Sequence, residues 1–252
     1  AQWARDKFVC VGLDSELQRI PDVAKRAGIN DTIVAFNSAI VGATSDLVGV
    51  YKPNIAFYEA YGDRGFRALR DTIAFINKAA PEVPVILDAK RADIGNTNAG
   101  YVEMAFSYLG VDAITVHPYL GAEALEPFLA RPEKGIFVLC RTSNPGAGEF
   151  QDIGITFDFE EGKFITEKTG SYFMSQEGYH GKLYEHLAYQ VSQRWNKNGN
   201  CGLVVGATYP DELREVRKIV GDMPILIPGV GSQQKDVPLE EQVKQVVSAG
   251  KD

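Results

Sequence analysis

The stretch Val85–Thr97, with the sequence VILDAKRADIGNT, carries the clearest signal of the fold class. It opens with the apolar run Val85–Leu87, which predicts a short buried strand, and continues with charged residues at Asp88, Lys90 and Asp93. Because side chains alternate along a strand, we expect Asp88 and Lys90 to project to the same side. Charged residues that directly follow a buried strand are typical of parallel α/β folds, whose sites lie at the carboxyl ends of the strands.

The same pattern recurs outward from this stretch, with short apolar runs alternating with longer amphipathic ones. The predicted strands are Phe8–Gly12, Leu47–Tyr51, Val85–Leu87, Ala113–Val116, Ile136–Cys140, Gly202–Val205 and Ile225–Ile227. The predicted helices include Gly65–Ala79, Tyr184–Trp195 and Glu240–Ala249, where apolar residues recur at spacings of three and four. This alternation calls for parallel strands joined by right-handed crossovers. In a chain of 252 residues it favours a (β/α)8 TIM barrel, of class α/β, over an open sheet.

The domain organisation follows from the same pattern. We expect a single barrel domain over residues 1–252, with a long loop insertion at about 144–181. Within the insertion, TFDFEEGKFIT predicts a small hairpin that turns at Glu161-Gly162. An eighth strand is not identifiable before Asp252. Because an open seam would leave two unpaired strand edges, we expect this strand to lie beyond Asp252 rather than the barrel to close by another route.

Composition narrows the class of protein. The formal net charge of −7 argues against a general nucleic-acid-binding surface, although local cations still allow an anionic small molecule to bind. No apolar run approaches the roughly 20 residues that span a bilayer, and the first residues contain no signal-peptide pattern. Cys10, Cys140 and Cys201 each adjoin a strand-like run, which indicates buried free thiols in a reducing compartment. We therefore expect a cytoplasmic protein without membrane or nucleic-acid partners.

A polar residue follows every predicted strand, as the barrel requires of its active-site end. In chain order these are Asp14, Lys52, Asp88 with Lys90, His117, Arg141 with Ser143, Thr208, and the turn Pro228-Gly229-Val230-Gly231. Taken alone, D-x-K-x-x-D fits a surface salt-bridge network equally well. Its position after a buried strand, with Lys52 and Asp14 on neighbouring strands, favours a catalytic lysine held between carboxylates. Asn96 or Thr97 is expected to cap the helix that follows.

The turn IPGVGSQ at residues 227–233 predicts a phosphate site, because glycines let backbone N–H groups approach an anion. A tight turn is the alternative, and Gln233 would add a side-chain donor to a phosphate site. His117 either lines the pocket or supports it. No residues have zinc-ligand spacing, no serine has a recognisable base nearby, and no pyridoxal motif is found, so no metal and no cofactor are expected.

Five motifs in order carry a family resemblance: GLD at 12–14, YKPN at 51–54, LDAKRADIGNT at 87–97, RTSNP at 141–145 and IPGVGSQ at 227–233. Together they resemble the orotidine 5′-phosphate decarboxylases over nearly the whole chain. The resemblance implies conversion of orotidine 5′-phosphate to uridine 5′-phosphate in pyrimidine synthesis without a cofactor. Two features depart from the family: its phosphate-binding arginine after strand 8 is not found, and the insertion at 150–181 is longer than usual.

The resemblance also implies a role for each matched residue. Lys90 would protonate C6 of the pyrimidine, Asp88 would face the substrate carboxylate, and Lys52 would pair with Asp88 and the ribose hydroxyls. Asp93 and Thr97 would reach the active site of the other subunit of a homodimer. The implied substrate contacts are Asp14 to the ribose, Ser143 to the pyrimidine, and Pro228, Gly229, Gly231 and Gln233 at the phosphate.

Two alternatives stay open. The first is an Mg²⁺-dependent phosphosugar synthase or decarboxylase, since such barrels carry a similar D-x-K-x-x-D; YKPN and RTSNP argue against it. The second is a catalytically inactive barrel that binds a phosphate ligand, which would follow if the arginine were truly absent.

Overall fold

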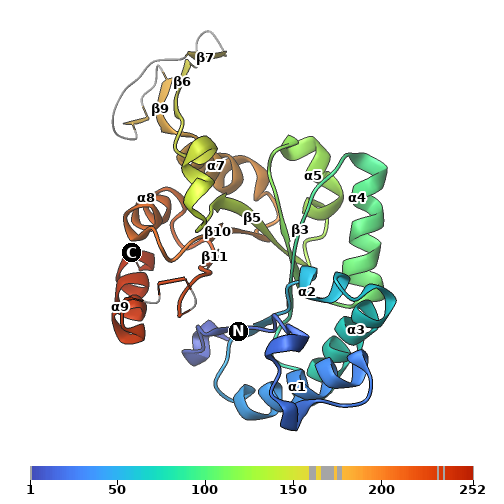
Figure 1. The fold of residues 1–252 in the computed structure, drawn as a ribbon. Coiled ribbons are helices and arrows are strands. Elements are labelled where there is room, and N and C mark those ends of the chain that lie inside the picture. Colours follow the sequence, from blue (N-terminus) through green and yellow to red (C-terminus); the bar gives the residue numbers. More distant parts are fainter. Residues whose placement is uncertain are drawn as a thin grey trace. The chain divides into compact units, whose positions relative to one another are not determined.

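The computed structural model describes residues 2–158, 163–165, 173–174, 178–231, 233–234 and 236–251. It separates into two compact units. Figure 1 shows the helices and strands of both units. Unit 1 comprises Ala1–Val116 and Glu133–Gly135, and unit 2 comprises His117–Pro132 and Ile136–Asp252. The single-domain organisation remains a prediction.

Unit 1 contains the first four predicted strands. They are β1 (Cys10–Gly12), β2 (Val50–Lys52), β3 (Ile86–Arg91) and β4 (Ala113–Val116). β1 pairs with β2, and β3 pairs with β4, both in parallel. Two isolated parallel bridges connect the β2 region to the β3 region. One joins Tyr51 of β2 to Val85, the residue before β3, and the other joins Asn54, which follows β2, to Asp88 of β3. The parallel pairing predicted from the β-then-α alternation is therefore confirmed here.

The helices of unit 1 lie between these strands in the chain. They are α1 (Ile29–Thr44), α2 (Ala56–Glu59), α3 (Gly62–Ala79) and α4 (Gly95–Val102), with a π-helical continuation at Glu103–Tyr108 and short 3-10 turns at Trp3–Arg5, Leu17–Arg19 and Asp22–Ala24. The predicted helix Gly65–Ala79 is α3, and its apolar face is buried through Leu69, Ile73 and Ile76. Burying one such side chain contributes about 1.5–3 kcal/mol.

Unit 2 contains the other three predicted strands, β5 (Gly135–Arg141), β10 (Cys201–Val205) and β11 (Ile225–Leu226). β10 pairs in parallel with both β5 and β11. Its helices are α5 (Gly121–Leu129), α6 (Gly148–Gln151), α7 (Leu183–Gln190) with a π-helical end at Val191–Trp195, α8 (Pro210–Val220) and α9 (Leu239–Gly250), with a 3-10 turn at Pro145–Ala147. In the described part of the chain, no parallel strand follows β11, and no helix is both long and apolar enough to cross a membrane.

The insertion is more regular than expected from its sequence. β6 (Gly154–Asp158) and β7 (Lys163–Ile165) pair antiparallel, which confirms the predicted hairpin, although its turn at 159–162 lies outside the described residues. β9 (Gly178–Lys182) pairs with β6 and with β8 (Phe173–Met174), so the order is β7-β6-β9-β8. The prediction of a loop was wrong for these residues, because β9 lies far along the chain from β6 and local patterns do not reveal such pairing.

All three cysteines carry free thiols, as predicted; Cys140 and Cys201 are also buried as predicted, whereas Cys10 is partly exposed. Burial raises the pKa of Cys10 and of Cys201 to about 11, and it also raises the pKa of Cys140. Since the thiolate is the reactive form, these side chains act as small apolar groups in the folded protein.

Candidate active site

The central motif lies on an irregular part of β3. Ile86 and Leu87 pair with Ala113 and Ile114, and the next pair is Arg91↔Val116, so three residues of β3 face one residue of β4. Within this bulge Lys90 has a φ of 48°, in the left-handed region that residues other than glycine rarely adopt. We had expected Asp88 and Lys90 on one side of the strand because side chains alternate regularly along a strand. That reason was wrong, because the strand is bulged between Leu87 and Arg91.

The two side chains nevertheless meet, as predicted. Lys90 Nζ lies 2.6 Å from Asp88 Oδ1, and Lys52 Nζ lies 3.4 Å from Asp88 Oδ2. The side chains of Lys52 and Asp88 are only 11% and 12% exposed, whereas that of Lys90 is 47% exposed. The carboxylate is thus held between two cations, and the more accessible cation is the predicted proton donor.

The electrostatics of the cluster favour an ionised Asp88. Burial acts to raise the pKa of this carboxyl, but Lys52, Lys90 and a hydrogen bond from Thr115 together hold it below its ordinary value. Asp88 therefore remains an anion at neutral pH, and it balances part of the charge of both lysines. The alternative interpretation of the motif, a salt-bridge network on the surface, does not fit this cluster, because Lys52 and Asp88 are largely buried.

Thr115 also contacts this cluster, although it was not among the predicted site residues. Its hydroxyl donates to Asp88 Oδ1 at 2.9 Å, from a side chain that is almost wholly buried on β4. The available signal was its position as the one polar residue in the apolar run AITV. A hydroxyl inside such a run costs free energy unless it is hydrogen-bonded, so it calls for a buried partner.

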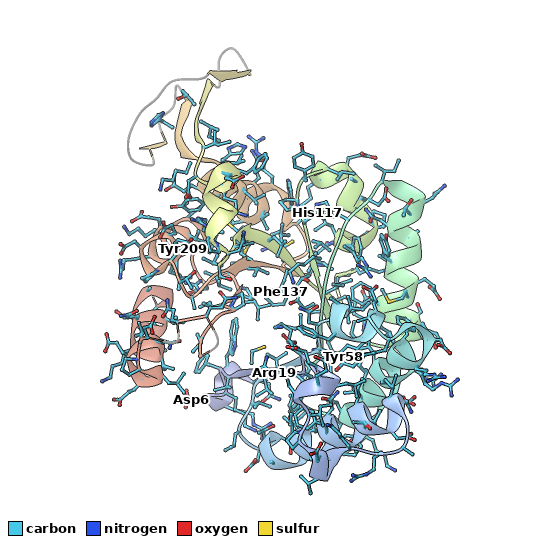
Figure 2. The ribbon with its side chains drawn as sticks, in the orientation of Figure 1. Asp6, Arg19, Tyr58, His117, Phe137 and Tyr209 are labelled. Atoms are coloured by element: carbon cyan, nitrogen blue, oxygen red, sulfur yellow. The ribbon has the colours of Figure 1, made fainter. Side chains whose placement is uncertain are left out.

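Asp14 follows β1 and is supported by a buried polar network beneath it. The neighbouring Ser15 hydroxyl donates to Asn37 Oδ1 at 2.5 Å, and Asn37 Nδ2 donates to Tyr58 Oη at 3.0 Å and to Thr72 Oγ1 at 3.2 Å. Tyr58, labelled in Figure 2, donates in turn to the Leu13 carbonyl at 2.8 Å. These bonds hold the Leu13 carbonyl and the Ser15 side chain on either side of Asp14, which is itself exposed.

Desolvation raises the pKa of Asp14, and the Asp88 carboxylate adds to this effect while Lys52 opposes it. Lys52 thus acts to lower the pKa of both Asp14 and Asp88, and its ion pair is with Asp88. The predicted grouping of Asp14, Lys52, Asp88 and Lys90 is present within unit 1.

The prediction that Asn96 or Thr97 caps the next helix was wrong. α4 begins at Gly95, and its N-cap Ile94 makes no side-chain capping bond. Instead the buried Asn98 closes the loop, because its Oδ1 accepts the Asp93 N–H at 2.8 Å and its Nδ2 donates to the Asp93 carbonyl at 2.5 Å. Asp93 is partly exposed and Thr97 is exposed.

In unit 2, the residues after β5 include a buried ion pair. Arg141, only 2% exposed, contacts both carboxylate oxygens of Asp152 at 3.0 Å. Its guanidinium carbon lies 3.9 Å from the ring centroid of Tyr209, labelled in Figure 2. Arg141, one of the polar residues expected at a strand end, therefore has a structural role here. The predicted pyrimidine contact Ser143 is partly exposed, and its carbonyl accepts a bond from Thr208 Oγ1 at 3.2 Å.

The turn after β11 has the backbone geometry that its glycines allow. Gly229 and Gly231 have φ values of 107° and 81°, which side-chain-bearing residues rarely adopt. The Pro228 carbonyl accepts the Ala207 N–H at 2.9 Å, and the Gln233 N–H donates to the Gly229 carbonyl at 3.2 Å. The Gly231 N–H is already used, since it donates to Oε1 of the buried Gln242 on α9 at 2.7 Å. Of the two glycine N–H groups predicted to bind phosphate, one thus has an internal partner.

Gln242 organises this turn, because its Nε2 also donates to the carbonyls of Gln234 and Val237 at 2.9 and 2.7 Å. Replacing Gln242 with leucine is expected to weaken binding of uridine 5′-phosphate, the product that the family resemblance implies, by up to about 100-fold, since the turn loses three bonds worth roughly 1 kcal/mol each. Isothermal titration measures this affinity, and Gln245→Leu is the matched control, because Gln245 is a partly exposed residue of α9 whose side chain bonds to Glu241 and not to the turn. Unchanged affinity for Gln242→Leu would contradict this role.

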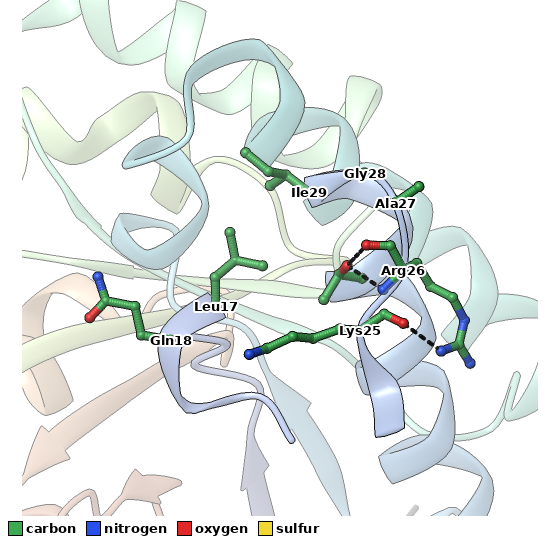
Figure 3. A pocket seen from close by; sticks show the side chains of 8 residues that line it. Leu17, Gln18, Lys25, Arg26, Ala27, Gly28 and Ile29 are labelled. Atoms are coloured by element: carbon green, nitrogen blue, oxygen red, sulfur yellow. Dashed lines mark hydrogen bonds between the residues drawn. The ribbon is translucent and has the colours of Figure 1, made fainter. Parts of the chain in front are cut away.

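A separate cavity of about 350 Å³ lies in unit 1 and is shown in Figure 3. It is lined by Leu17, Gln18, Lys25, Arg26, Ala27, Gly28, Ile29 and Thr32. None of the predicted site residues lines it. The Thr32 hydroxyl accepts the Arg26 N–H at 2.9 Å and donates to the Arg26 carbonyl at 3.1 Å, which closes the loop before α1.

Within the described ranges, no group of three or more His, Cys, Asp or Glu side chains is placed to hold a metal ion. The charged groups brought together in unit 1 are two lysines and two aspartates. Such a set binds an anionic ligand through its cations and offers a proton from an ammonium group.

Comparison with known proteins places the chain in a family. Residues 7–160 match the model of the "Orotidine 5'-phosphate decarboxylase / HUMPS family". An orotidine 5′-phosphate decarboxylase of Herpetosiphon aurantiacus is 47% identical over 91% of this chain and 76% of its own length. The enzyme of that name from Thermomicrobium roseum is 48% identical over 91% of this chain and 73% of its own.

Solved structures agree with these relatives. The structure of Leishmania donovani OMP decarboxylase is similar with a TM-score of 0.75 and 34% identity, covering 99% of this chain and 81% of that one. This likeness confirms the predicted fold class, an α/β barrel of the TIM type. On the matched motifs, the family model and these relatives, the chain belongs to the orotidine 5′-phosphate decarboxylase family.

Proposed function

We propose that this chain decarboxylates orotidine 5′-phosphate to uridine 5′-phosphate in pyrimidine nucleotide synthesis. The observation that carries the proposal is the pairing of Lys90 Nζ with Asp88 Oδ1 at 2.6 Å, on the motif through which the chain resembles the family. Two other hypotheses are not favoured: an Mg²⁺-dependent phosphosugar synthase or decarboxylase, and a catalytically inactive barrel. The relatives that match most of the chain are named as orotidine 5′-phosphate decarboxylases.

The reaction breaks the bond between C6 and the carboxylate, so that CO₂ leaves and the electron pair remains on C6. Lys90 then gives a proton from its ammonium group to C6 and regains one from solvent. A fixed cation at a developing negative charge stabilises the transition state, and this kind of preorganisation is often the largest catalytic term. Asp88 orients the lysine through their 2.6 Å contact, and it also places an anion where the substrate carboxylate would bind.

The remaining roles are proposed from the family resemblance. Lys52 and Asp14 would contact the ribose, and Ser143 would contact the pyrimidine. Backbone N–H groups at the turn would bind the phosphate with help from the Gln233 side chain, with Pro228, Gly229 and Gly231 shaping that turn. Binding energy from the phosphate, which is remote from C6, would contribute to catalysis at C6.

We further propose a cytoplasmic homodimer in which Asp93 and Thr97 of one subunit complete the site of the other. In support, Asp93 makes no contact with Lys90 within one chain that the structure records, and the neighbouring Ile94 is 61% exposed. The free thiols support the cytoplasmic location.

Subunit mixing tests the shared site. Lys90→Ala and Asp93→Ala are each expected to be inactive, and mixing them should restore activity, because a mixed dimer contains one site with both native residues. Activity of the unmixed, refolded variants is the control. No recovery in a mixture shown to contain mixed dimers would refute the shared arrangement.

The assay for the function follows the absorbance change as orotidine 5′-phosphate becomes uridine 5′-phosphate. We expect turnover by the chain that persists after treatment with EDTA. Loss of activity on chelation would favour the phosphosugar enzymes. Tight binding of uridine 5′-phosphate without turnover would favour an inactive binding protein.

A further inference from the structure

The bulge in β3 leaves backbone groups without their usual ladder partners. Between the pairs Leu87↔Ile114 and Arg91↔Val116, the residues Asp88, Ala89 and Lys90 stand against the single residue Thr115. The Asp88 N–H donates to the Pro53 carbonyl at 2.9 Å, so the N–H groups that the bulge leaves outside the regular ladder are those of Ala89 and Lys90. Buried N–H groups without a partner destabilise the fold, so some other acceptor must be present.

That acceptor is the Thr115 hydroxyl. Its Oγ1 accepts the N–H of Ala89 at 3.0 Å and the N–H of Lys90 at 2.9 Å. The same hydroxyl donates its proton to Asp88 Oδ1 at 2.9 Å. A hydroxyl has one donor and two acceptor positions, so all three are used, on a side chain that is 1% exposed.

The three bonds act on the two residues that matter for the reaction. Two of them hold the backbone of the bulge, including Lys90 in its left-handed conformation with φ of 48°. The third fixes the same carboxylate oxygen that Lys90 Nζ contacts at 2.6 Å. Without these bonds little would maintain the left-handed conformation, which is unfavourable for a residue other than glycine.

We infer that Thr115 is a positioning residue for the decarboxylation: it holds the bulge of β3 so that Lys90 and Asp88 keep the relative placement that proton transfer to C6 requires. This inference rests on the proposed function. Thr115 acts through Lys90 and Asp88, so its loss should slow the chemical step rather than weaken nucleotide binding.

Replacing Thr115 with valine keeps the shape of the side chain and removes the hydroxyl. We expect kcat for orotidine 5′-phosphate to fall about 10- to 100-fold, because small misplacement of catalytic groups lowers the rate on this scale. KM and the affinity for uridine 5′-phosphate should change less than about threefold, since uniform binding is untouched. Thr115→Ser, which keeps the hydroxyl, should recover most of the lost kcat.

Thr32→Val is the matched control, because it also removes a buried hydroxyl with two backbone hydrogen bonds, away from the predicted site residues. It should leave kcat unchanged. Urea unfolding of each variant shows whether it is folded at the assay temperature. If Thr115→Val does not fold, Thr115→Cys, which also lacks the hydroxyl, should show the same loss of kcat.

Two outcomes would overturn the inference: wild-type kcat in a folded Thr115→Val or Thr115→Cys protein, or a loss of kcat in Thr115→Ser equal to that of Thr115→Val. Both are judged against wild-type turnover. Absence of turnover in the wild-type chain would instead refute the proposed function, so the two failures are distinguishable.

Discussion

Replacing Lys90 with alanine is expected to lower kcat for orotidine 5′-phosphate by roughly 10⁴-fold or more. General acid catalysis contributes about 10²–10⁴ to an enzymatic rate, and one preorganised electrostatic group contributes about 10²–10³. Lys90 is proposed to supply both. Because 47% of its side chain is exposed, its removal leaves no buried cavity, and the protein should stay folded. Single-turnover assays with a large excess of enzyme would measure the residual rate.

The binding of nucleotide is the internal control for this variant. Affinity for uridine 5′-phosphate should survive, because Lys90 acts on the reacting carbon and other residues are proposed to bind the ribose and phosphate. Lys218→Ala is a matched control on the surface of α8, where Lys218 pairs with Glu215 at 2.8 Å. Substantial residual turnover by Lys90→Ala, beyond any trace of wild-type enzyme, would disprove the assigned role.

Replacing Arg141 with methionine is expected to lower the free energy of unfolding by about 3 kcal/mol. Breaking a buried ion pair by removing one partner costs about 3–5 kcal/mol, since the other charge remains without compensation. The lower end applies because Asp152 is 31% exposed and water can partly solvate it. The stacking of the guanidinium on Tyr209 is lost as well. Urea denaturation followed by circular dichroism measures the change.

Arg214→Met provides the comparison for this prediction. Arg214 pairs with Asp211 at 2.6 Å on the surface of α8, where Asp211 is 88% exposed, and exposed pairs contribute little to stability. We expect no measurable change in its unfolding curve. Lys at position 141 should recover only part of the stability, because it can neither bind both oxygens of Asp152 nor stack in the same plane. Equal stability of Arg141→Met and the wild type would show that the pair contributes nothing.

Local sequence patterns were enough to predict the strands and helices and the charged residues that follow them. Hydrophobic periodicity located the seven parallel strands, because burial on a strand or a helix face requires a regular spacing of apolar residues. It also identified Lys52, Asp88 and Lys90 as a group, because parallel strands end at the same edge. These features depend on local patterns, so they can be read without coordinates.

The way in which those residues are held depends on tertiary contacts. The bulge that places Lys90, the use of Thr115 to support it, and the loop closure by Asn98 depend on pairings between distant segments. The same holds for Arg141, whose partners Asp152 and Tyr209 turn a candidate site residue into a structural one. The identity of a polar side chain fixes only which hydrogen bonds it can donate or accept. Packing of the folded chain selects the partner, because buried donors and acceptors must be hydrogen-bonded.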